Sequence, residues 1–130
     1  MATEILLNDG GAPARILPFV AGEDVTAGNA LTVNTSGEVV NANSGDSANK
    51  FAAVGYALTT ITSGNIVSVI SGHGVVLNVN CADVDAGIAM MMGTTDGRLL
   101  TATAAASGPL AQATTLENNS AAGLTKVITH

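Results

Sequence analysis

The feature that most constrains the fold of this sequence is an internal duplication of glycine-punctuated segments. Residues 25–31, VTAGNAL, recur as residues 84–90, VDAGIAM. Residues 37–42, GEVVNA, recur as residues 97–102, GRLLTA, with one extra residue inserted between the two segments of the second copy. Two copies indicate a duplicated unit rather than a solenoid, because a solenoid needs three or more repeats to bury a continuous core.

Weaker similarity extends the duplication downstream. Residues 54–57, VGYA, have an echo in residues 110–113, LAQA, and residues 67–70 match residues 124–128 with small gaps. Each copy therefore reads as a turn, a strand, a glycine hairpin, a strand, a loop, a strand, a turn and a strand. The duplicated unit is about 59 residues long.

The segments between the glycines have the pattern of β-strands. Residues 66–70, IVSVI, and 75–79, VVLNV, alternate in part between polar and apolar, which is typical of a strand with one buried face. No window places apolar residues at i, i+3, i+4 and i+7 over three helical turns. We therefore predict an all-β fold, a small β-barrel or sandwich built from the two units, because either arrangement hides the sheet edges.

The repeated glycines mark the expected turns. Gly37 and Gly97 lie between two strands of each copy, where a hairpin requires a residue with positive φ. Gly28 and Gly87 follow an alanine in the turn before a strand, where the missing Cβ allows a tight bend. These four positions predict the same turn geometry in both copies.

The first twenty residues lie outside the repeat and predict a separate organisation. We expect an extended N-terminal arm over residues 1–20 and a single β domain over residues 21–130. Within that domain the repeats run from about 24 to 72 and from about 83 to 130. No stretch of this chain reaches the length of about 18 apolar residues that a membrane-spanning helix needs.

The arm carries two short apolar segments, ILL at residues 5–7 and ILPF at residues 16–19. A segment with apolar patches that it cannot bury alone suits docking on a neighbouring protein, by adding a strand to that protein's sheet. The alternative is that the arm returns as an edge strand onto its own domain. The sequence leaves both interpretations open.

Composition argues against several kinds of partner. Charged residues make up 11% of the chain, against roughly 25% in an average soluble domain, and the formal net charge is −6. Nucleic-acid binding rests on clustered cations and stacking aromatics, yet four basic residues are scattered and the chain has two Phe, one Tyr and no Trp. We expect no nucleic-acid partner and no membrane partner, and a low-charge surface that is covered by other proteins.

The residues that could carry chemistry do not form a recognisable set. His73 lies in a glycine turn, His130 ends the sequence, and no Gly-x-Ser-x-Gly motif is present. Asp83 and Asp85 alternate and could hold calcium weakly, but solvated turn carboxylates are the simpler interpretation. The single cysteine, Cys81, cannot form an internal disulfide and is interpreted as a small buried residue. We predict no enzyme, no cofactor, no metal and no catalytic residue.

The order of these motifs resembles a known family. The segments VTAGNAL, SGEVVNA, AVGYAL, SGNIVSV and GHGV follow one another after the opening ILLNDGGAPARILPF. That order is similar to the small capsid decoration proteins, also called cement or head-fibre proteins, of tailed bacteriophages. The resemblance extends from about Ile5 to Ile128, and it is carried by the order and the duplication because each motif is short.

The resemblance implies a structural virion protein without catalysis. Such a protein is assembled in the host cytoplasm, binds the outer surface of the phage capsid and clamps neighbouring major capsid subunits, as a homo-oligomer for which a trimer is favoured. An alternative is a virion-surface binding module, either fibre-like or glycan-binding, although glycan sites usually present aromatic side chains. The contact residues that the resemblance implies in the arm are Ile5, Leu6, Leu7, Arg15, Ile16 and Phe19.

Overall fold

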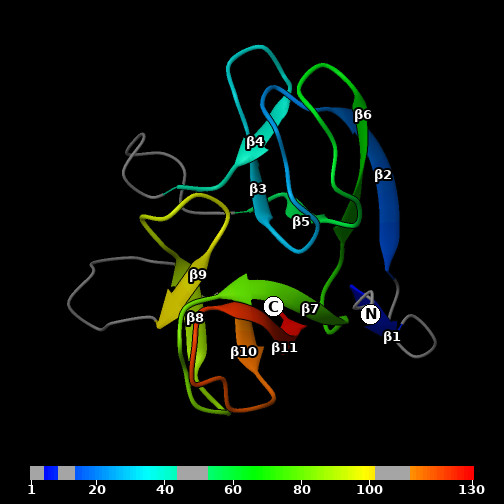
Figure 1. Ribbon diagram of the computed structural model, residues 1–130. Helices are drawn as coiled ribbons and strands as arrows, with labels where there is room; N and C mark the ends of the chain where they lie inside the picture. The colour runs from blue at the N-terminus through cyan, green and yellow to red at the C-terminus, as the bar shows by residue number, and fades with distance from the viewer. Residues whose placement is uncertain (1–4, 9–13, 44–52, 102–111) are drawn as a thin grey trace.

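The computed structural model describes residues 5–8, 14–43, 53–101 and 112–130, and all regular secondary structure in these ranges is β-strand. The strands form two sheets, one above the other in Figure 1. The predicted all-β class is therefore confirmed, and the two sheets correspond to the two duplicated units.

The first sheet contains five antiparallel strands in the order β2, β6, β5, β3, β4. Its two outer strands meet where Ala21, just after β2, forms a parallel bridge with Val39 of β4. The Gly22 N–H donates to the Val39 carbonyl at 2.8 Å, so the sheet closes on itself as a small barrel. The strand bounds are β2 (Arg15–Val20), β3 (Ala30–Val33), β4 (Val39–Asn41), β5 (Gly55–Ala57) and β6 (Ile66–Ser71).

The second sheet has the order β1, β7, β11, β10, β8, β9 and is closed in the same way. Cys81 of β7 pairs in parallel with Leu99 of β9, and the Ala82 N–H donates to the Leu99 carbonyl at 2.8 Å. The strand bounds are β1 (Leu6–Asn8), β7 (Val76–Cys81), β8 (Ala89–Met92), β9 (Leu99–Thr101), β10 (Ala113–Thr115) and β11 (Gly123–Thr129).

The duplication extends through the whole strand topology. Strands β2 to β6 correspond in order and direction to strands β7 to β11, so each unit has five strands and begins one strand before the repeat seen in the sequence. The isolated antiparallel bridge between Val25 and Ile61 also recurs, between Val84 and Asn119. Among the described residues, only β1 has no counterpart in the other barrel.

One detail of the predicted repeat is displaced. Tyr56 pairs with Ile70 in the first barrel, and Thr114 pairs with Ile128 at the corresponding place in the second. The register therefore differs by two residues from the predicted echo of residues 54–57 in residues 110–113, of which 110 and 111 lie outside the described residues. A shift by two keeps the same side chains inside the barrel, because successive residues of a strand point to opposite faces.

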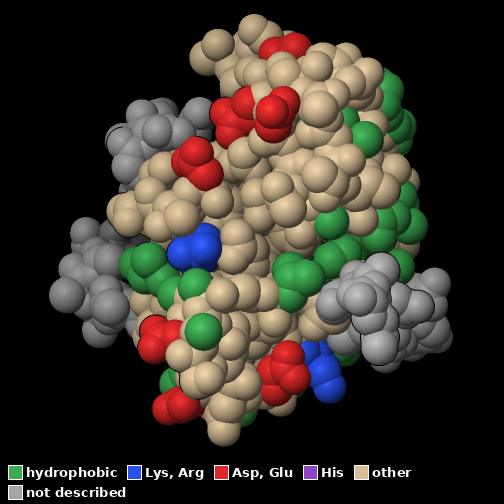
Figure 2. All heavy atoms as spheres, in the orientation of Figure 1, with side chains coloured by type: hydrophobic (Ala, Val, Ile, Leu, Met, Phe, Trp, Pro, Cys, Tyr) green, Lys and Arg blue, Asp and Glu red, His purple; other side chains and the backbone are tan. Residues whose placement is uncertain are grey.

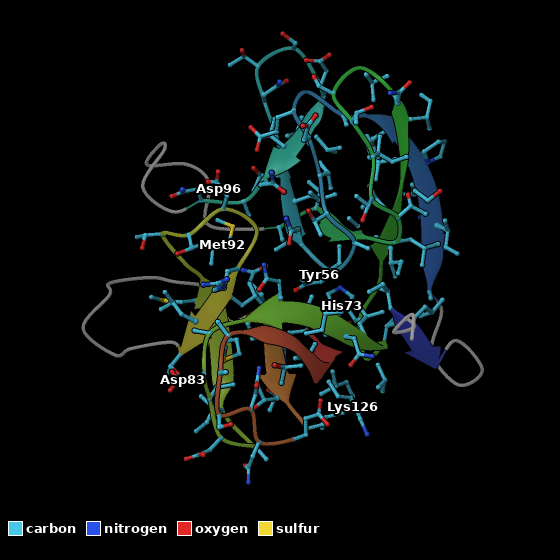
Figure 3. The ribbon with its side chains drawn as sticks, in the orientation of Figure 1. Tyr56, His73, Asp83, Met92, Asp96 and Lys126 are labelled. Atoms are coloured by element: carbon cyan, nitrogen blue, oxygen red, sulfur yellow. The ribbon has the colours of Figure 1, made fainter. Side chains whose placement is uncertain are left out.

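The cores of both barrels are built from small aliphatic side chains. Along β7, Leu77, Val79 and Cys81 are buried while the residues between them are half-buried, which is the alternation that the sequence predicts. Tyr56 is buried where the two barrels meet (Figure 3) and belongs to a core cluster that contains residues of both. Burial raises the pKa of the Tyr56 phenol well above its usual range.

A joint between the barrels is formed by the turn that precedes β3 in the first barrel and the outer edge of β7 in the second. The Asn80 N–H donates to the Gly28 carbonyl at 2.8 Å, and the Asn80 side-chain amide donates to Asn29 Oδ1 at 3.1 Å. The Ala30 N–H donates to the Gly97 carbonyl at 2.9 Å. Two backbone hydrogen bonds and one side-chain hydrogen bond therefore fix how the two barrels are oriented relative to each other.

A chain of polar side chains continues from this joint into the first barrel. The Asn29 amide donates to Asn41 Oδ1 at 2.9 Å, and the Asn41 amide donates to Glu23 Oε2 at 2.6 Å. At the other end, Arg98 Nε donates to Asn80 Oδ1 at 3.2 Å. Buried amides that are satisfied on both sides have defined orientations, so this chain specifies a single arrangement of the joint.

Glycine pairs from the two repeats allow the packing of the joint to be measured. Gly37 and Gly97 both have positive φ, of 82° and 72°, but a Cβ would meet open space at Gly37 and the Asn29 side chain at Gly97. We expect Gly37→Ala to lower the free energy of unfolding by about 1 kcal/mol from backbone strain alone. Gly97→Ala should lose about 1–3 kcal/mol more through overpacking. Urea denaturation of both variants tests this, and equal losses would show that Asn29 does not pack on Gly97 tightly.

The buried cysteine provides a second test of the fold. Cys81 is fully buried in the second barrel, and this burial raises the pKa of its thiol to about 12. Because the thiolate is the reactive form, we expect iodoacetamide at pH 8 to alkylate native Cys81 at least about a hundredfold more slowly than the unfolded chain. Mass spectrometry at timed intervals measures both rates, and similar rates would contradict the burial of β7.

Candidate interaction surface

Most of the large exposed apolar side chains of the first barrel lie along β2 and at the beginning of β6, with Val33 and Val54 elsewhere. Ile16 is 51% exposed, Val20 is 38% exposed and Ile66, which pairs with Val20, is 57% exposed. Figure 2 shows hydrophobic side chains along this edge of the molecule, at the right of the view. A run of large apolar residues on the outer face of a strand is typical of a surface that another molecule covers.

Along residues 15–20 the outer edge of β2 carries no paired strand among the described residues, and the contact with β4 that closes the barrel begins only at Ala21. In the sheet order, β2 pairs only with β6, whereas the corresponding strand β7 is flanked by β1 and by β11. Pro18, in the middle of β2, has no N–H, which is how natural sheets weaken an edge against uncontrolled pairing. The β2 edge is thus both apolar and partly protected.

The arm itself is divided between the two barrels. β1 pairs with β7, with Leu6 opposite Leu77, while β2 pairs with β6 along its whole length, from Arg15 opposite Ser71 to Val20 opposite Ile66. In the described parts of the arm, both strands therefore pair with strands of this same chain, as the second interpretation expects. The residues that join the two strands, 9–13, lie outside the described residues.

The predicted contact residues of the arm lie in different environments. Ile5 is 5% exposed and belongs to the core cluster, and Leu6 packs against that cluster. Phe19 is half-buried and packs against the core of the first barrel. Leu7 is part of β1, but its side chain is not among those described. Arg15 and Ile16 are exposed at the beginning of β2 and lie at a surface.

Sequence reasoning missed two residues of this surface, Val20 and Ile66. Ile66 opens a strand of alternating pattern, IVSVI, and the alternation separates two faces without telling which face has a neighbour. Val67, the next residue, is fully buried in the same strand. Only the pairing of β6 with β2, which places Ile66 beside Val20, defines the exposed apolar surface.

A hollow of about 360 Å³ between the barrels is lined by both histidines, His73 and His130. His130 Nε2 lies 2.6 Å from the Thr114 hydroxyl, and His73 is exposed in its glycine turn. Arg15 and Tyr56 also line this hollow, and no Asp or Glu is among its lining residues in the described part of the chain. Two imidazoles without a carboxylate to orient them do not form the arrangement that activates a nucleophile.

The candidate calcium ligands lie elsewhere. Asp83 and Asp85 line a separate hollow of about 420 Å³ in the second barrel, well apart from His73 (Figure 3). The other lining residues bring no third carboxylate, and the described ranges contain no group of three or more His, Cys, Asp or Glu side chains arranged to hold a metal. In the same ranges no helix has the length and hydropathy to span a membrane.

Comparisons with known proteins give a fold of the same kind. No family model matches this sequence, and no curated protein matches it either. The class that the structure defines is an all-β protein of two duplicated five-stranded barrels. A solved structure of similar fold is the head fiber gp8.5 N base of bacteriophage phi29, with a TM-score of 0.66 and 13% sequence identity, over 90% of this chain and 94% of that chain. At this identity the similarity shows the fold.

The exposed and half-buried apolar residues of this surface should differ in their contribution to stability. We expect Ile66→Ser to change the free energy of unfolding by no more than about 0.5 kcal/mol, because its side chain is largely in water already. Phe19→Ala should cost about 2 kcal/mol or more, because Phe19 packs on the first core. Urea denaturation monitored by circular dichroism measures both. A large loss for Ile66→Ser would mean that this residue supports the fold rather than a surface.

Proposed function

We propose that this protein is a structural component of a bacteriophage particle that attaches to the outer surface of the capsid. The observation that carries the proposal is the shared fold with a head fiber base, which covers almost the whole of both chains. The motif order of the sequence supports the same assignment independently, since it does not depend on the coordinates. The residues that the structure describes offer a surface for binding and no arrangement for catalysis.

The physical character of the chain suits attachment to a repeating shell. With 11% charged residues, little desolvation of charge opposes burial of its surface against another protein. A capsid presents many identical sites, so modest contacts made by several copies or by both barrels add up through effective concentration. We further propose that the bound protein clamps neighbouring major capsid subunits and thereby stabilises the shell.

The contact surface that we assign to the capsid is the beginning of β2. Arg15 and Ile16 are exposed there, and Arg15 also lines the hollow between the two barrels. Ile5 and Phe19 are held by packing within the chain, so we assign the contact to Arg15 and Ile16 in preference to them. A basic residue beside an apolar one also suits an acidic or neutral subunit surface.

A second candidate function is a fibre-like attachment module, which the similarity in fold to the base of a head fiber favours. In that case the protein would occupy the capsid surface to hold another structure rather than to strengthen the shell. The two functions differ in a measurable way, because only a clamp raises the temperature at which empty shells disassemble.

Copy number tests the proposed function first. We expect quantitative mass spectrometry of purified particles from the source of this chain to find it in a simple ratio to the major capsid protein, because a clamp occupies equivalent lattice positions. A handful of copies per particle would favour the fibre-like module, and absence from the particles would refute both candidates.

Recombinant protein then tests the contact surface. We expect Ile16→Asp to weaken cosedimentation with stripped shells by about tenfold or more, because a carboxylate would be buried at the apolar contact. Leu116→Asp is the matched control, since Leu116 is also exposed but lies on the second barrel just after β10. If the two substitutions weakened binding equally, the beginning of β2 would not be the surface that contacts the capsid.

A further inference from the structure

The joint is formed by a turn of the first barrel and an edge of the second barrel. Because the two barrels are duplicated, each of these parts has an equivalent in the other barrel, and both equivalents are uncovered. We call the turn before β3, residues 27–30, the head of the first barrel, and the outer edge of β7 together with Leu124 the socket of the second. By the duplication, the head of the second barrel is residues 86–89, and the socket of the first barrel is the outer edge of β2 together with Ile66. The joint inserts the first head into the second socket.

The two heads differ sharply in exposure. Gly28, Asn29 and Ala30 are all buried, because the second barrel covers them. Their counterparts Gly87 and Ala89 are exposed, and a Cβ at Gly87 would meet nothing, whereas one at Gly28 would collide with Leu124. The second head therefore has the conformation of the first, with φ of 80° against 91° at its glycine, and lacks the neighbour that the first has.

The two sockets show the same difference. Leu124, which covers Gly28, corresponds to Ile66, which is 57% exposed. Asn80, whose N–H binds the head of the first barrel, corresponds to Val20. Because the Ala21 N–H is directed towards β6, where it donates to Asn65, the alternation of strand hydrogen bonds directs the Val20 N–H to the free edge. The donor that the joint uses is therefore present at the empty socket.

The side chains at the two uncovered halves are complementary to each other. In the existing joint the head residue Asn29 meets the socket residue Asn80, an amide with an amide. The corresponding residues of the uncovered halves are both apolar: Ile88 in the head, which is half-buried and packs in part against the core cluster, and Val20 in the socket, which is 38% exposed. The uncovered halves thus carry an apolar pair where the joint carries a polar pair, so a contact between them would bury no unsatisfied amide.

We propose that the uncovered head of one copy of this chain docks in the uncovered socket of a second copy and repeats the joint between molecules. Ile88 then packs on Val20, Ile66 covers Gly87, and the Val20 N–H donates to the Gly87 carbonyl. The contact is head-to-tail, so successive copies close into a ring or extend as a filament according to their relative rotation. The proposal concerns self-association and does not depend on the capsid.

The occupant of the socket is the head of a second copy and not an added strand. On β7 the added strand β1 is anchored by the Asn78 N–H, which donates to the Ile5 carbonyl at 2.8 Å. The residue of β2 that corresponds to Asn78 is Pro18, which has no N–H to donate. The first socket has therefore lost the bond that holds a strand and has kept the bond that holds a head.

Cysteine cross-linking of the full-length protein tests the arrangement. Val20→Cys and Ile88→Cys are made separately, mixed at high protein concentration and treated with a short bis-maleimide; wild-type protein, whose only thiol is the buried Cys81, is the control. We expect a covalent dimer in the mixture that contains one chain of each variant. A dimer of Val20→Cys alone would show pairing of two β2 edges instead, and either that result or the absence of any dimer would overturn the proposal.

Sedimentation with compensating substitutions tests the chemistry of the contact. We expect Val20→Asn and Ile88→Asn each to weaken self-association at least about tenfold, since each buries an amide against an apolar side chain. The double variant should recover most of that loss, because it recreates the pair that Asn29 and Asn80 form in the joint. Leu116→Asp should leave association unchanged. Failure of the double variant to recover, while it remains folded by circular dichroism, would contradict the contact of these two residues.

Discussion

The joint around Asn29 is the contact on which the rest of this structure depends. Each barrel has a thin core of Val, Leu, Ile, Ala and Met side chains, and the core cluster that contains Tyr56 is completed only when the two barrels meet. Asn29 accepts a hydrogen bond from Asn80 of the second barrel and donates one to Asn41 of the first. An amide that is left unsatisfied in such a place costs about 1–3 kcal/mol, so any other orientation of the barrels is penalised. The apolar contact holds the barrels together, and the amides determine how they are oriented.

Much of this fold could be predicted from the sequence, because the two copies repeat the residues that specify turns. Gly37 and Gly97 adopt the positive φ expected at the hairpins, and Gly28 and Gly87, which were expected in tight bends, also have positive φ. The first strand of each unit could not be recognised as a repeat, since the outward residues of β2 and β7 have different neighbours. Pro18 and Val20 face an open edge, whereas Asn78 and Asn80 contact β1 and the joint, and this difference has removed the similarity. The exposed surface was missed for a related reason: strand periodicity separates two faces without showing which one is covered.

The two duplicated units share one strand topology and differ mainly in the residues on their outer surfaces. Most of the inward residues of both units are aliphatic, because they fill the closed interior of a small barrel. The outward residues differ according to what they contact. Asn78 and Asn80 are amides on the strand that β1 and the first barrel cover, whereas Val20 is apolar and lies at the open edge. The low charge of the chain is also consistent with the proposed assembly, since charged side chains would have to be desolvated at each contact.

The pairing of β1 with β7 has a consequence for how the chain folds. Leu6 lies opposite Leu77, so the N-terminal strand is held by a part of the chain about seventy residues later, and the whole first barrel lies in the loop between them. Closing so long a loop is entropically costly and contributes a high contact order, which slows folding. As the chain emerges from the ribosome, the first barrel can form while β1 waits for the second. Once β1 is in place it ties the beginning of the chain to the barrel made last, so we expect the two barrels to unfold as one cooperative unit.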